Sequence, residues 1–377
     1  MKIIYCIPSL LGMGGLKRVL TNKINYLVEN YGYDVTIVTR RLGDRPPYYP
    51  LSPKVQIIDL KLESRHTNGL ISKLKSYLSI IFQYYTALKK ILYEVKPDVT
   101  ISVFSFELYF LFLLNDGSKK IVECHGPRYF WSSYPAKGIT KITRRIRNRI
   151  HSLLLKKYDA FVVLTHEDRA AWKELRNVYV IPNPINTSDQ KASLNNNTVV
   201  SVGRLVEGKR FDHLIRAWSI VHQNHPEWRL NIVGDGNLRP ELNSLIKTLN
   251  LEQTVFLKGE SKNIIKEYLS ASVFVLASEH EGLPMVLLEA MSFGLPLISY
   301  SCPCGPKDLI QNGVNGFLVE PLDYYGLAEK ITSLLSNPEM INNMGQNNYE
   351  KSSMFGEEKI MRSWNDLFSS LLEKNIF

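Results

Sequence analysis

Cysteine and long apolar runs are both scarce in this chain of 377 residues. Only four cysteines occur: Cys6, Cys124, Cys302 and Cys304. That is too few for the disulfide framework of a small secreted domain. The longest apolar run, VTISVFSFELYFLFLLN, contains Glu107 and falls short of the roughly 20 residues that a spanning helix needs. The opening MKIIYCIPSLLGMGG imitates a signal peptide only until Pro8. We therefore expect reduced thiols and no transmembrane segment.

Acidic residues are scarce in the first half of the chain. Residues 1–185 hold 29 Lys and Arg and 14 Asp and Glu, a net charge of +15, whereas the rest holds 17 and 22, a net charge of −5. KITRRIRNRIHSLLLKKYDA and SKLKSYLSIIFQYYTALKK combine these cations with apolar residues. Such stretches suit an anionic membrane surface, a nucleic acid, or a core-facing helix with a basic solvent side. No nucleic-acid-binding motif occurs, so no nucleic-acid partner is expected.

Short apolar strands alternate with amphipathic helices along most of the chain. The first series is KIIYCIP, YDVTIVT, DVTISVF, KKIVECHG and AFVVLT, and the second is TVVSVG, RLNIVGDG, TVFLKG, SVFVLAS, LPLISY and GFLV. VYVIPNPINTS and the polar run after it predict a linker near Pro182–Asn186. The pattern predicts an α/β protein with two doubly wound, Rossmann-like domains facing each other, residues 1–183 and 184–356. Residues 357–377 form a further amphipathic helix.

The segment SEHEGLPMVLLEAMSFG places two glutamates around a predicted helix start. The preceding strand ends at Ser278, Pro284 suits the first helical position, and Gly294 suits the residue just past the helix end. Glu281 then lies in the turn before the helix and Glu289 inside it. Because the first N–H groups of a helix lack intrahelical acceptors, this turn is an anion site. The alternative is that the glutamates only cap the helix and face solvent.

A second motif, TVVSVGRLVEGKR, places two cations just past a strand end. Arg204 offers a fork of donors and Lys209 a point charge, and both suit a diphosphate. A solvated basic loop is the alternative. Cations at one strand–helix junction together with glutamates at another favour the functional interpretation over coincidence.

These segments together resemble the retaining glycosyltransferases of family 4, which have the two-domain GT-B fold. The likeness rests on SVGRL followed by Lys209, on GDG, and on EGLPMVLLE with seven residues between its glutamates. GMGGLKRVL, VIPNPI and CPCGPKDLIQNGVNGFLV also match, so the resemblance covers nearly the whole chain. It implies that the final helix crosses back to the first domain.

The resemblance also implies roles for individual residues. Arg204 and Lys209 would neutralise the donor diphosphate, and Glu281 would contact the donor sugar near its anomeric carbon. Glu289 would bind the ribose hydroxyls, and His125 in ECHGPR would lie near the reacting carbon. The implied catalytic residues are His125, Glu281, Arg204 and Lys209. The other implied donor-binding residues are Gly14, Gly15, Gly203, Leu257, Lys258, Gly282, Leu283, Pro284, Met285, Val286 and Glu289.

The implied activity is transfer of a hexose or N-acetylhexosamine from a nucleotide-diphosphate donor, with UDP as the expected nucleotide and with the anomeric configuration retained. The implied acceptor is a lipid-linked saccharide for a bacterial lipopolysaccharide, capsule or exopolysaccharide. The protein would then be cytoplasmic and peripheral on the anionic inner face of the cell membrane. No D-x-D occurs in the sequence, so no metal and no other cofactor is expected. A soluble acceptor remains an alternative.

Two departures from the family pattern concern the first domain. GGLKR has Lys17 where the family often carries an acid, which leaves the handling of the acceptor open. ECHGPR has Cys124 where some relatives carry glutamate, with Glu123 one position earlier. In the second domain, CPCGP lacks the further ligands of a metal site and the C-x-x-C spacing of a redox pair. We predict that Cys302 and Cys304 are small buried residues in a turn.

Three other classes fit parts of the sequence. A dinucleotide-dependent oxidoreductase would need a third glycine where Lys17 stands, and an acid rather than VTRR after the second strand. A sugar-nucleotide epimerase of the same fold would not need the paired glutamates. A non-catalytic scaffold at the membrane would not need the cations that precede them.

Overall fold

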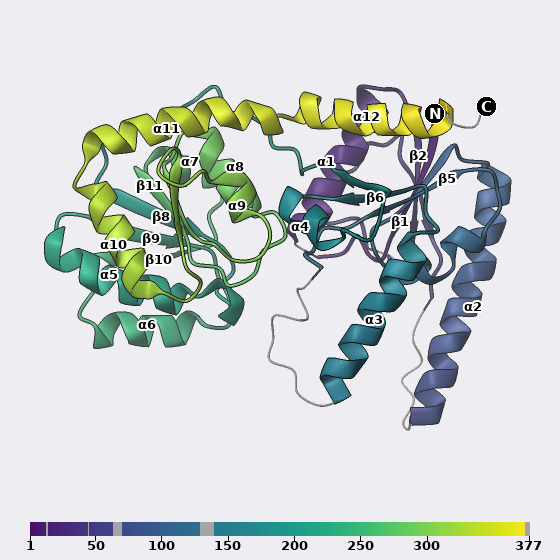
Figure 1. Cartoon of the computed structure of the whole chain (residues 1–377), viewed down its shortest axis with the longest axis horizontal. Coiled ribbons are helices and arrows are strands. Elements are labelled where there is room, and N and C mark those ends of the chain that lie inside the picture. Colours follow the sequence, from purple (N-terminus) through teal and green to yellow (C-terminus); the bar gives the residue numbers. More distant parts are fainter. Residues whose placement is uncertain (13, 44, 63–69, 129–138, 374–377) are drawn as a thin grey trace. The chain divides into compact units, whose positions relative to one another are not determined.

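The computed structural model describes residues 1–377 except 13, 44, 63–69, 129–138 and 374–377 (Figure 1). The chain divides into two compact units. The first unit contains Met1–Leu164, Asp168–Pro184 and Ile360–Phe377, and the second contains Thr165–Glu167 and Ile185–Lys359. Both are α/β units built on a parallel sheet, which confirms the predicted fold class.

In the first unit the described strands form one sheet in the order β3-β2-β1-β4-β5-β6-β7, with every neighbouring pair parallel. The strands are β1 (Lys2–Ile7), β2 (Asp34–Thr39), β3 (Gln56–Asp59), β4 (Val99–Ser102), β5 (Lys119–Glu123), β6 (Ala160–Val163) and β7 (Val178–Val180). The strand order reverses between β1 and β4, and the carboxyl ends there mark a ligand crevice.

Helices cover both faces of this sheet because each strand is apolar on both sides. The longer helices are α1 (Gly15–Glu29), α2 (Leu70–Val95), α3 (Ile139–Leu155) and α12 (Glu357–Glu373), and α4 (His166–Ala171) is short. One core joins the sheet to α1 and to α12 through Trp364 and Phe368, and the opposite core includes Tyr84 and Leu88 of α2. The final helix therefore packs from Ile360 onward in the first unit.

In the second unit the order is β10-β9-β8-β11-β12-β13, again with parallel neighbours. The strands are β8 (Thr198–Val202), β9 (Arg229–Val233), β10 (Val255–Gly259), β11 (Val273–Leu276), β12 (Leu297–Tyr300) and β13 (Gly316–Val319). The helices are α5 (Phe211–Asn224), α6 (Arg239–Thr248), α7 (Ile264–Leu269), α8 (Met285–Ser292), α9 (Pro306–Leu309), α10 (Tyr324–Leu335) and α11 (Pro338–Ser352). The order reverses between β8 and β11.

Four features of the structure differ from the predictions. β3 was not predicted, and β7 lies in the segment VYVIPNP that we assigned to the linker, because its backbone pairs with β6. α8 begins at Met285, so that Pro284 is the cap residue rather than the first helical one. Thr165–Glu167 groups with the second unit although it follows β6 directly. Among the described residues, no helix combines the length and the hydropathy needed to cross a membrane.

Candidate functional site

The predicted site residues of the second unit follow the carboxyl ends of its strands. Gly203 and Arg204 follow β8, and Glu281 lies between β11 and α8. Because β8 and β11 are neighbours at the reversal of strand order, these residues lie at the edge where open α/β sheets bind ligands. A backbone hydrogen bond of 2.9 Å from Glu279 N to Gly208 O joins the two loops.

Lys209 and Glu281 contact each other directly. The distance from Lys209 Nζ to Glu281 Oε1 is 2.5 Å, and their side chains are 25% and 12% exposed. Arg210 and Glu279 form a second pair beside them, with 3.1 Å between Nε and Oε2. Arg204 is exposed and its side chain forms no ion pair with any residue that the structure describes. This edge thus carries an exposed arginine that forms no ion pair with a described residue. It also carries a lysine whose pairing can be exchanged, because both members of its pair reach solvent.

α8 supplies the remaining glutamate and an anion site. Glu289 lies on this helix, half-buried, and its Oε2 accepts a hydrogen bond of 2.7 Å from Tyr268 Oη. The Tyr268 ring stacks on Phe293 with 5.4 Å between the ring centroids. The segment Gly282–Val286 contains the helix start, whose N–H groups lack intrahelical acceptors.

The loops after β9 and β10 pack tightly beside Gly203. A Cβ atom on Gly234 would lie 2.0 Å from the Gly203 carbonyl oxygen, so only glycine fits at this position of GDG. Gly234 N also donates to Gly259 O at 2.7 Å, and Arg239 Nη2 donates to Leu257 O at 2.9 Å. These contacts bring Leu257 and the exposed Lys258, which the resemblance assigns to donor binding, to the same edge as Arg204.

The segment CPCGP packs against the start of α8. A Cβ atom on Gly305, whose φ is +99°, would lie 2.4 Å from Pro284 Cδ. Cys302 and Cys304 are buried, as predicted, and burial raises the pKa of the Cys302 thiol to about 12. Both cysteines therefore fill space behind the Glu281 turn, and Cys302 does so as a neutral thiol.

In the first unit the glycine pair lies at the start of α1, after the carboxyl end of β1. Gly14 has extended backbone angles and Gly15 is the first residue of the helix. Lys17 Nζ donates to the backbone oxygens of Leu11 and Gly12. Lys17, which replaces the usual acid, therefore holds the loop that precedes it.

His125 follows β5, at the same edge of the sheet, and contacts a buried ion pair. Its Nε2 lies 2.9 Å from Glu123 Oε1. Both oxygens of Glu123 also accept hydrogen bonds from Lys23 Nζ. Burial acts to raise the pKa of the Glu123 carboxyl, but Lys23 and His125 together hold it down at about 2.

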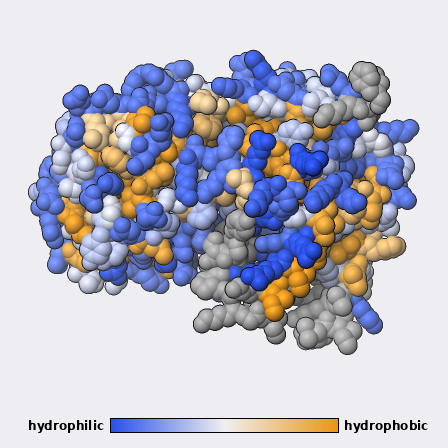
Figure 2. All heavy atoms as spheres, in the orientation of Figure 1, coloured by the Kyte–Doolittle hydropathy of each residue, from blue (hydrophilic) through white to orange (hydrophobic). Residues whose placement is uncertain are grey.

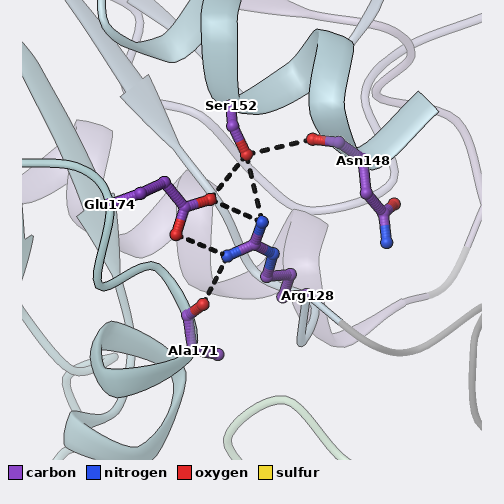
Figure 3. A network of polar contacts seen from close by, with 5 residues as sticks. All are labelled: Arg128, Asn148, Ser152, Ala171 and Glu174. Atoms are coloured by element: carbon purple, nitrogen blue, oxygen red, sulfur yellow. Dashed lines mark hydrogen bonds and ion pairs between the residues drawn. The ribbon is translucent and has the colours of Figure 1, made fainter. Parts of the chain in front are cut away.

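Arg128 anchors the ECHGPR loop to two helices (Figure 3). Its guanidinium donates to both carboxylate oxygens of Glu174, at 2.6 and 3.0 Å, and to Ser152 Oγ on α3 at 3.0 Å. A further bond reaches Ala171 O at the end of α4. The hydrogen bonds that Glu174 accepts from Arg128, and after them one of 2.7 Å from Ser152 Oγ, lower the pKa of Glu174 to about 2. The loop that carries His125 is thus fixed by a bidentate, charge-assisted contact.

The outer faces of α2 and α3 carry apolar side chains that are exposed to solvent, among charged ones. Figure 2 shows hydrophobic and strongly hydrophilic residues side by side over α3. The exposed apolar residues of these helices are Tyr77, Leu78, Phe82, Tyr93, Ile142, Ile146, Ile150 and Leu153. The isoleucine stripe of α3 is therefore not the core-facing side of an ordinary helix, which was one of our alternatives.

A cavity of about 290 Å³ lies in the first unit between α2, the loop after β4, and α3. Its lining includes Tyr77, Phe104, Phe106, Tyr109 and His151. Tyr109 Oη and His151 Nε2 are 3.0 Å apart. Phe104 has φ of +54°, a conformation that is uncommon for a bulky residue and that is found most often near functional sites.

Lys23 and the contact that it forms with Glu123 were not predicted from the sequence. A signal was present, since Lys23 lies on the buried stripe of α1 with Leu20, Ile24 and Leu27. A lysine on such a stripe requires a buried partner. The sequence could not name that partner, because Glu123 is 100 residues away along the chain.

Comparisons with known proteins agree with this architecture. Residues 184–351 match the family described as glycosyl transferases group 1, and residues 13–189 match glycosyltransferase family 4. An uncharacterized glycosyltransferase of Haemophilus influenzae is 31% identical over 372 residues, which are 96% of this chain and 98% of that protein. The amylovoran biosynthesis glycosyltransferase AmsD of Erwinia amylovora is 28% identical and covers 98% of this chain and 99% of its own length.

A third relative, from Campylobacter jejuni, is 28% identical over 98% of this chain and 99% of its own length. Its name describes an N-acetyl-D-galactosaminyltransferase acting on a diphospho-undecaprenol-linked saccharide. Among solved structures, a sucrose-phosphate synthase from Thermosynechococcus elongatus superposes with a TM-score of 0.81, 19% identity and 99% coverage of both chains. A mutant of S. aureus TarM in complex with UDP superposes with a TM-score of 0.76, 16% identity, and 97% and 99% coverage.

Proposed function

Because this chain belongs to glycosyltransferase family 4, we propose that it transfers a hexose or an N-acetylhexosamine from a nucleotide-diphosphate donor to a lipid-linked saccharide. UDP is the proposed nucleotide, and the anomeric configuration is retained. The proposed product belongs to a bacterial surface polysaccharide. The name of the Erwinia relative, which gives amylovoran biosynthesis, and that of the Campylobacter relative, which gives an acceptor linked to diphospho-undecaprenol, support this proposal. Sugar-nucleotide epimerisation on the same fold, and transfer to a soluble acceptor, are the alternatives that the experiments below separate.

The observation that carries the proposal is the group of charges at the β8/β11 edge. Arg204 is exposed there, and Lys209 is within 2.5 Å of Glu281. A diphosphate bound at this edge would take Lys209 Nζ and the Arg204 guanidinium as partners, and Glu281 would turn to the hydroxyls of the donor sugar. Glu289, already hydrogen-bonded to Tyr268, would accept from the ribose.

The chemistry that this arrangement supports is electrostatic. The bond between the anomeric carbon and the diphosphate oxygen breaks, and the leaving group gains negative charge as it does so. Arg204 and Lys209 would stabilise that charge, and one such donor is worth about 3 kcal/mol in comparable sites. Glu281 would stabilise positive charge on the sugar ring. In this proposal the two side chains neutralise the leaving group without a metal ion.

Features of the first unit support a lipid-linked acceptor at a membrane. Its half of the sequence carries a net charge of +15, and α2 and α3 expose apolar residues among cations. Each cation near an anionic lipid surface contributes about 1 kcal/mol, so several give salt-sensitive docking. The proposed location is the cytoplasmic face of the cell membrane. The aromatic cavity beside Phe104 suits the apolar face of a sugar ring of the acceptor.

A donor screen tests the catalytic proposal. The purified protein is incubated with UDP- and GDP-sugars in EDTA, with and without total lipid-linked saccharides as acceptor, and nucleotide release is followed. We expect release of UDP in EDTA, with the anomeric proton of the product showing the donor's configuration. An absolute requirement for Mg²⁺ or Mn²⁺, or an inverted product, would contradict it. Interconversion of two UDP-sugars without release of UDP would favour the epimerase.

Vesicle flotation tests the membrane proposal. The full chain should float with vesicles that contain anionic lipid, should float less in high salt, and should stay behind with neutral vesicles. Replacing the exposed Arg145 and Arg149 of α3 by alanine should reduce recovery. The matched control replaces two exposed cations of the second unit, Lys247 and Lys262, and should leave recovery unchanged. Equal recovery on neutral and anionic vesicles would contradict the electrostatic docking.

A further inference from the structure

The ion pair between Lys23 and Glu123 lies fully inside the first unit. Each residue is 1% exposed, and Lys23 Nζ donates to both oxygens of the carboxylate. The ammonium group also lies 3.8 Å from the ring centroid of Trp364 on α12 and 5.3 Å from that of Tyr5 on β1. Burying two charges is costly, and pairs of this kind are often replaceable by apolar residues without loss of stability. Its presence beside the loop that carries His125 is therefore informative.

The carboxylate has a second partner, which decides the state of the His125 ring. Glu123 Oε1 lies 2.9 Å from His125 Nε2. An ionised carboxylate can only accept hydrogen bonds, so the nitrogen that faces it must carry a proton. Lys23 keeps the carboxylate ionised, because a proton on Glu123 would compete with the ammonium donors. The pair thus selects the ring tautomer in which Nε2 is protonated.

The other ring nitrogen is left without a protein partner. His125 Nδ1 is buried and forms no hydrogen bond to any residue that the structure describes. Other titratable groups beside Glu123 are the Tyr5 hydroxyl on β1 and the Cys124 thiol, and Asp168 on α4 lies beside Cys124. Burial first, and then the charge of Glu123, raises the pKa of Tyr5, and burial raises the pKa of Cys124 to about 12. Both therefore stay neutral, and Glu123 is the charged group that touches the ring.

We infer that Lys23 and Glu123 are positioning residues that hold His125 with Nε2 on the Glu123 carboxylate and leave Nδ1 as the nitrogen that can bind a ligand. Glu123 orients the ring, Lys23 fixes Glu123, and Trp364 closes the pocket around the ammonium group. The significance for catalysis rests on the proposed function, in which His125 lies near the reacting carbon. The carboxylate also stabilises positive charge on the ring when Nδ1 takes a proton or donates a hydrogen bond.

The inference gives an unusual expectation for Glu123→Gln. Lys23 has only donors, so it should hold the amide oxygen of the glutamine. The amide NH₂ then faces His125 Nε2, which must become the acceptor, and the ring proton moves to Nδ1. The substitution therefore reverses the tautomer rather than merely weakening the contact. Adding Lys23→Met frees the amide to turn, so the double variant should show both tautomers.

The test is a long-range ¹H–¹⁵N spectrum of the full chain labelled with ¹⁵N-histidine, recorded at about pH 9, where imidazole rings are neutral. His125→Asn identifies the signals of His125 among the eight histidines. The wild-type ring should be protonated at Nε2, and Glu123→Gln should shift it to Nδ1. The control Glu174→Gln breaks a different carboxylate contact of the same loop and should leave the tautomer as in wild type.

A wild-type ring protonated at Nδ1, or an even mixture, overturns the inference without any variant. So does a Glu123→Gln protein that keeps the proton on Nε2. With a UDP-sugar that the wild type hydrolyses, Glu123→Gln should lower kcat by about tenfold or more and leave KM nearly unchanged. If the wild type turns over no sugar nucleotide, the proposed function fails, and the spectra still decide the tautomer.

Discussion

Two lysine–glutamate pairs lie at the carboxyl edges of the two sheets, and they differ in exposure far more than in distance. The side chains of Lys23 and Glu123 are 1% and 2% exposed, whereas those of Lys209 and Glu281 are 25% and 12% exposed. Aromatic rings surround the first lysine, and loops that include exposed Arg204 adjoin the second. A buried pair cannot be exchanged without leaving a charge in the core, whereas an open pair can release its lysine to a ligand.

Removing α12 should give the largest difference between the two units, because only the unit that holds the Lys23–Glu123 pair needs this helix to fold. Six residues of this helix are at most 5% exposed: Ile360, Met361, Trp364, Leu367, Phe368 and Leu371. At about 1.5–3 kcal/mol each, their burial rivals the whole stability of a domain. Deleting 357–377 should therefore unfold the first unit and abolish transfer, while the second unit still binds UDP. Ending the chain after Glu373 is the control, and a truncated protein with full transferase activity would refute the assignment.

Breaking the buried pair should cost stability directly. Lys23→Met leaves the Glu123 carboxylate without its main partner, so the free energy of unfolding should fall by about 3–5 kcal/mol. Lys23→Met combined with Glu123→Leu should recover much of that loss, because no buried charge remains. Denaturant unfolding of both variants measures the difference. Equal destabilisation by Lys23→Met and by Lys209→Met would erase the contrast between the pairs.

Acid should act on the buried pair in a defined direction. The folded-state pKa of Glu123, about 2, is below its ordinary value, so its contribution to stability is present above about pH 4.5 and is lost as the pH falls toward 2. That contribution is on the order of 3 kcal/mol. Thermal unfolding between these pH values should show a weaker acid dependence in the Lys23→Met, Glu123→Leu variant. An unchanged pH profile would mean that other carboxylates dominate acid unfolding.

Breaking the solvent-exposed pair, Lys209 and Glu281, should lower activity and leave stability nearly unchanged. Lys209→Ala, and separately Arg204→Ala, should lower turnover by at least about a hundredfold. The free energy of unfolding should change by less than about 1 kcal/mol, because a solvent-reachable pair contributes little to folding. Lys209→Arg keeps the charge and should retain more activity than Lys209→Ala. Near-wild-type rates in both alanine variants would remove these residues from the site.

Glu107 offers a third case, a buried carboxylate that forms no ion pair with a lysine in the part of the chain that the structure describes. Its Oε1 accepts from Ser102 Oγ at 2.7 Å, and burial raises its pKa to about 6. A raised acid pKa stabilises the fold below about pH 4.5, and this contribution is lost as the pH rises through 6. Glu107→Gln should therefore be more stable than wild type by on the order of 1–2 kcal/mol at pH 8, with no gain at pH 4. A variant that is less stable at pH 8 would contradict this sign.

Much of the fold was predictable from the sequence, and the exceptions have physical causes. Apolar runs such as SVFVLAS are recognisable as strands from the sequence alone, because a parallel strand buries both of its faces. β7 was missed because it has only three residues and is recognised by its pairing with β6. α12 was predicted as an amphipathic helix, but only the resemblance indicated the sheet that it covers. Arg204, Lys209 and Glu281 were found as motifs because each follows a strand end within a few residues.

The sequence by itself determined the two β-α series, the charge asymmetry and the motifs at the strand ends, since these depend on local spacing and composition. Only the tertiary structure decided which charges meet. Lys23 and Glu123 are 100 residues apart and join because β1, β4 and β5 are neighbours in the sheet. The difference in burial then gives the two pairs different roles. The buried pair Lys23–Glu123 fixes His125, and the exposed pair Lys209–Glu281 can exchange its partner. Exposure is a property of the packed chain, because a residue is screened from water by segments distant in sequence.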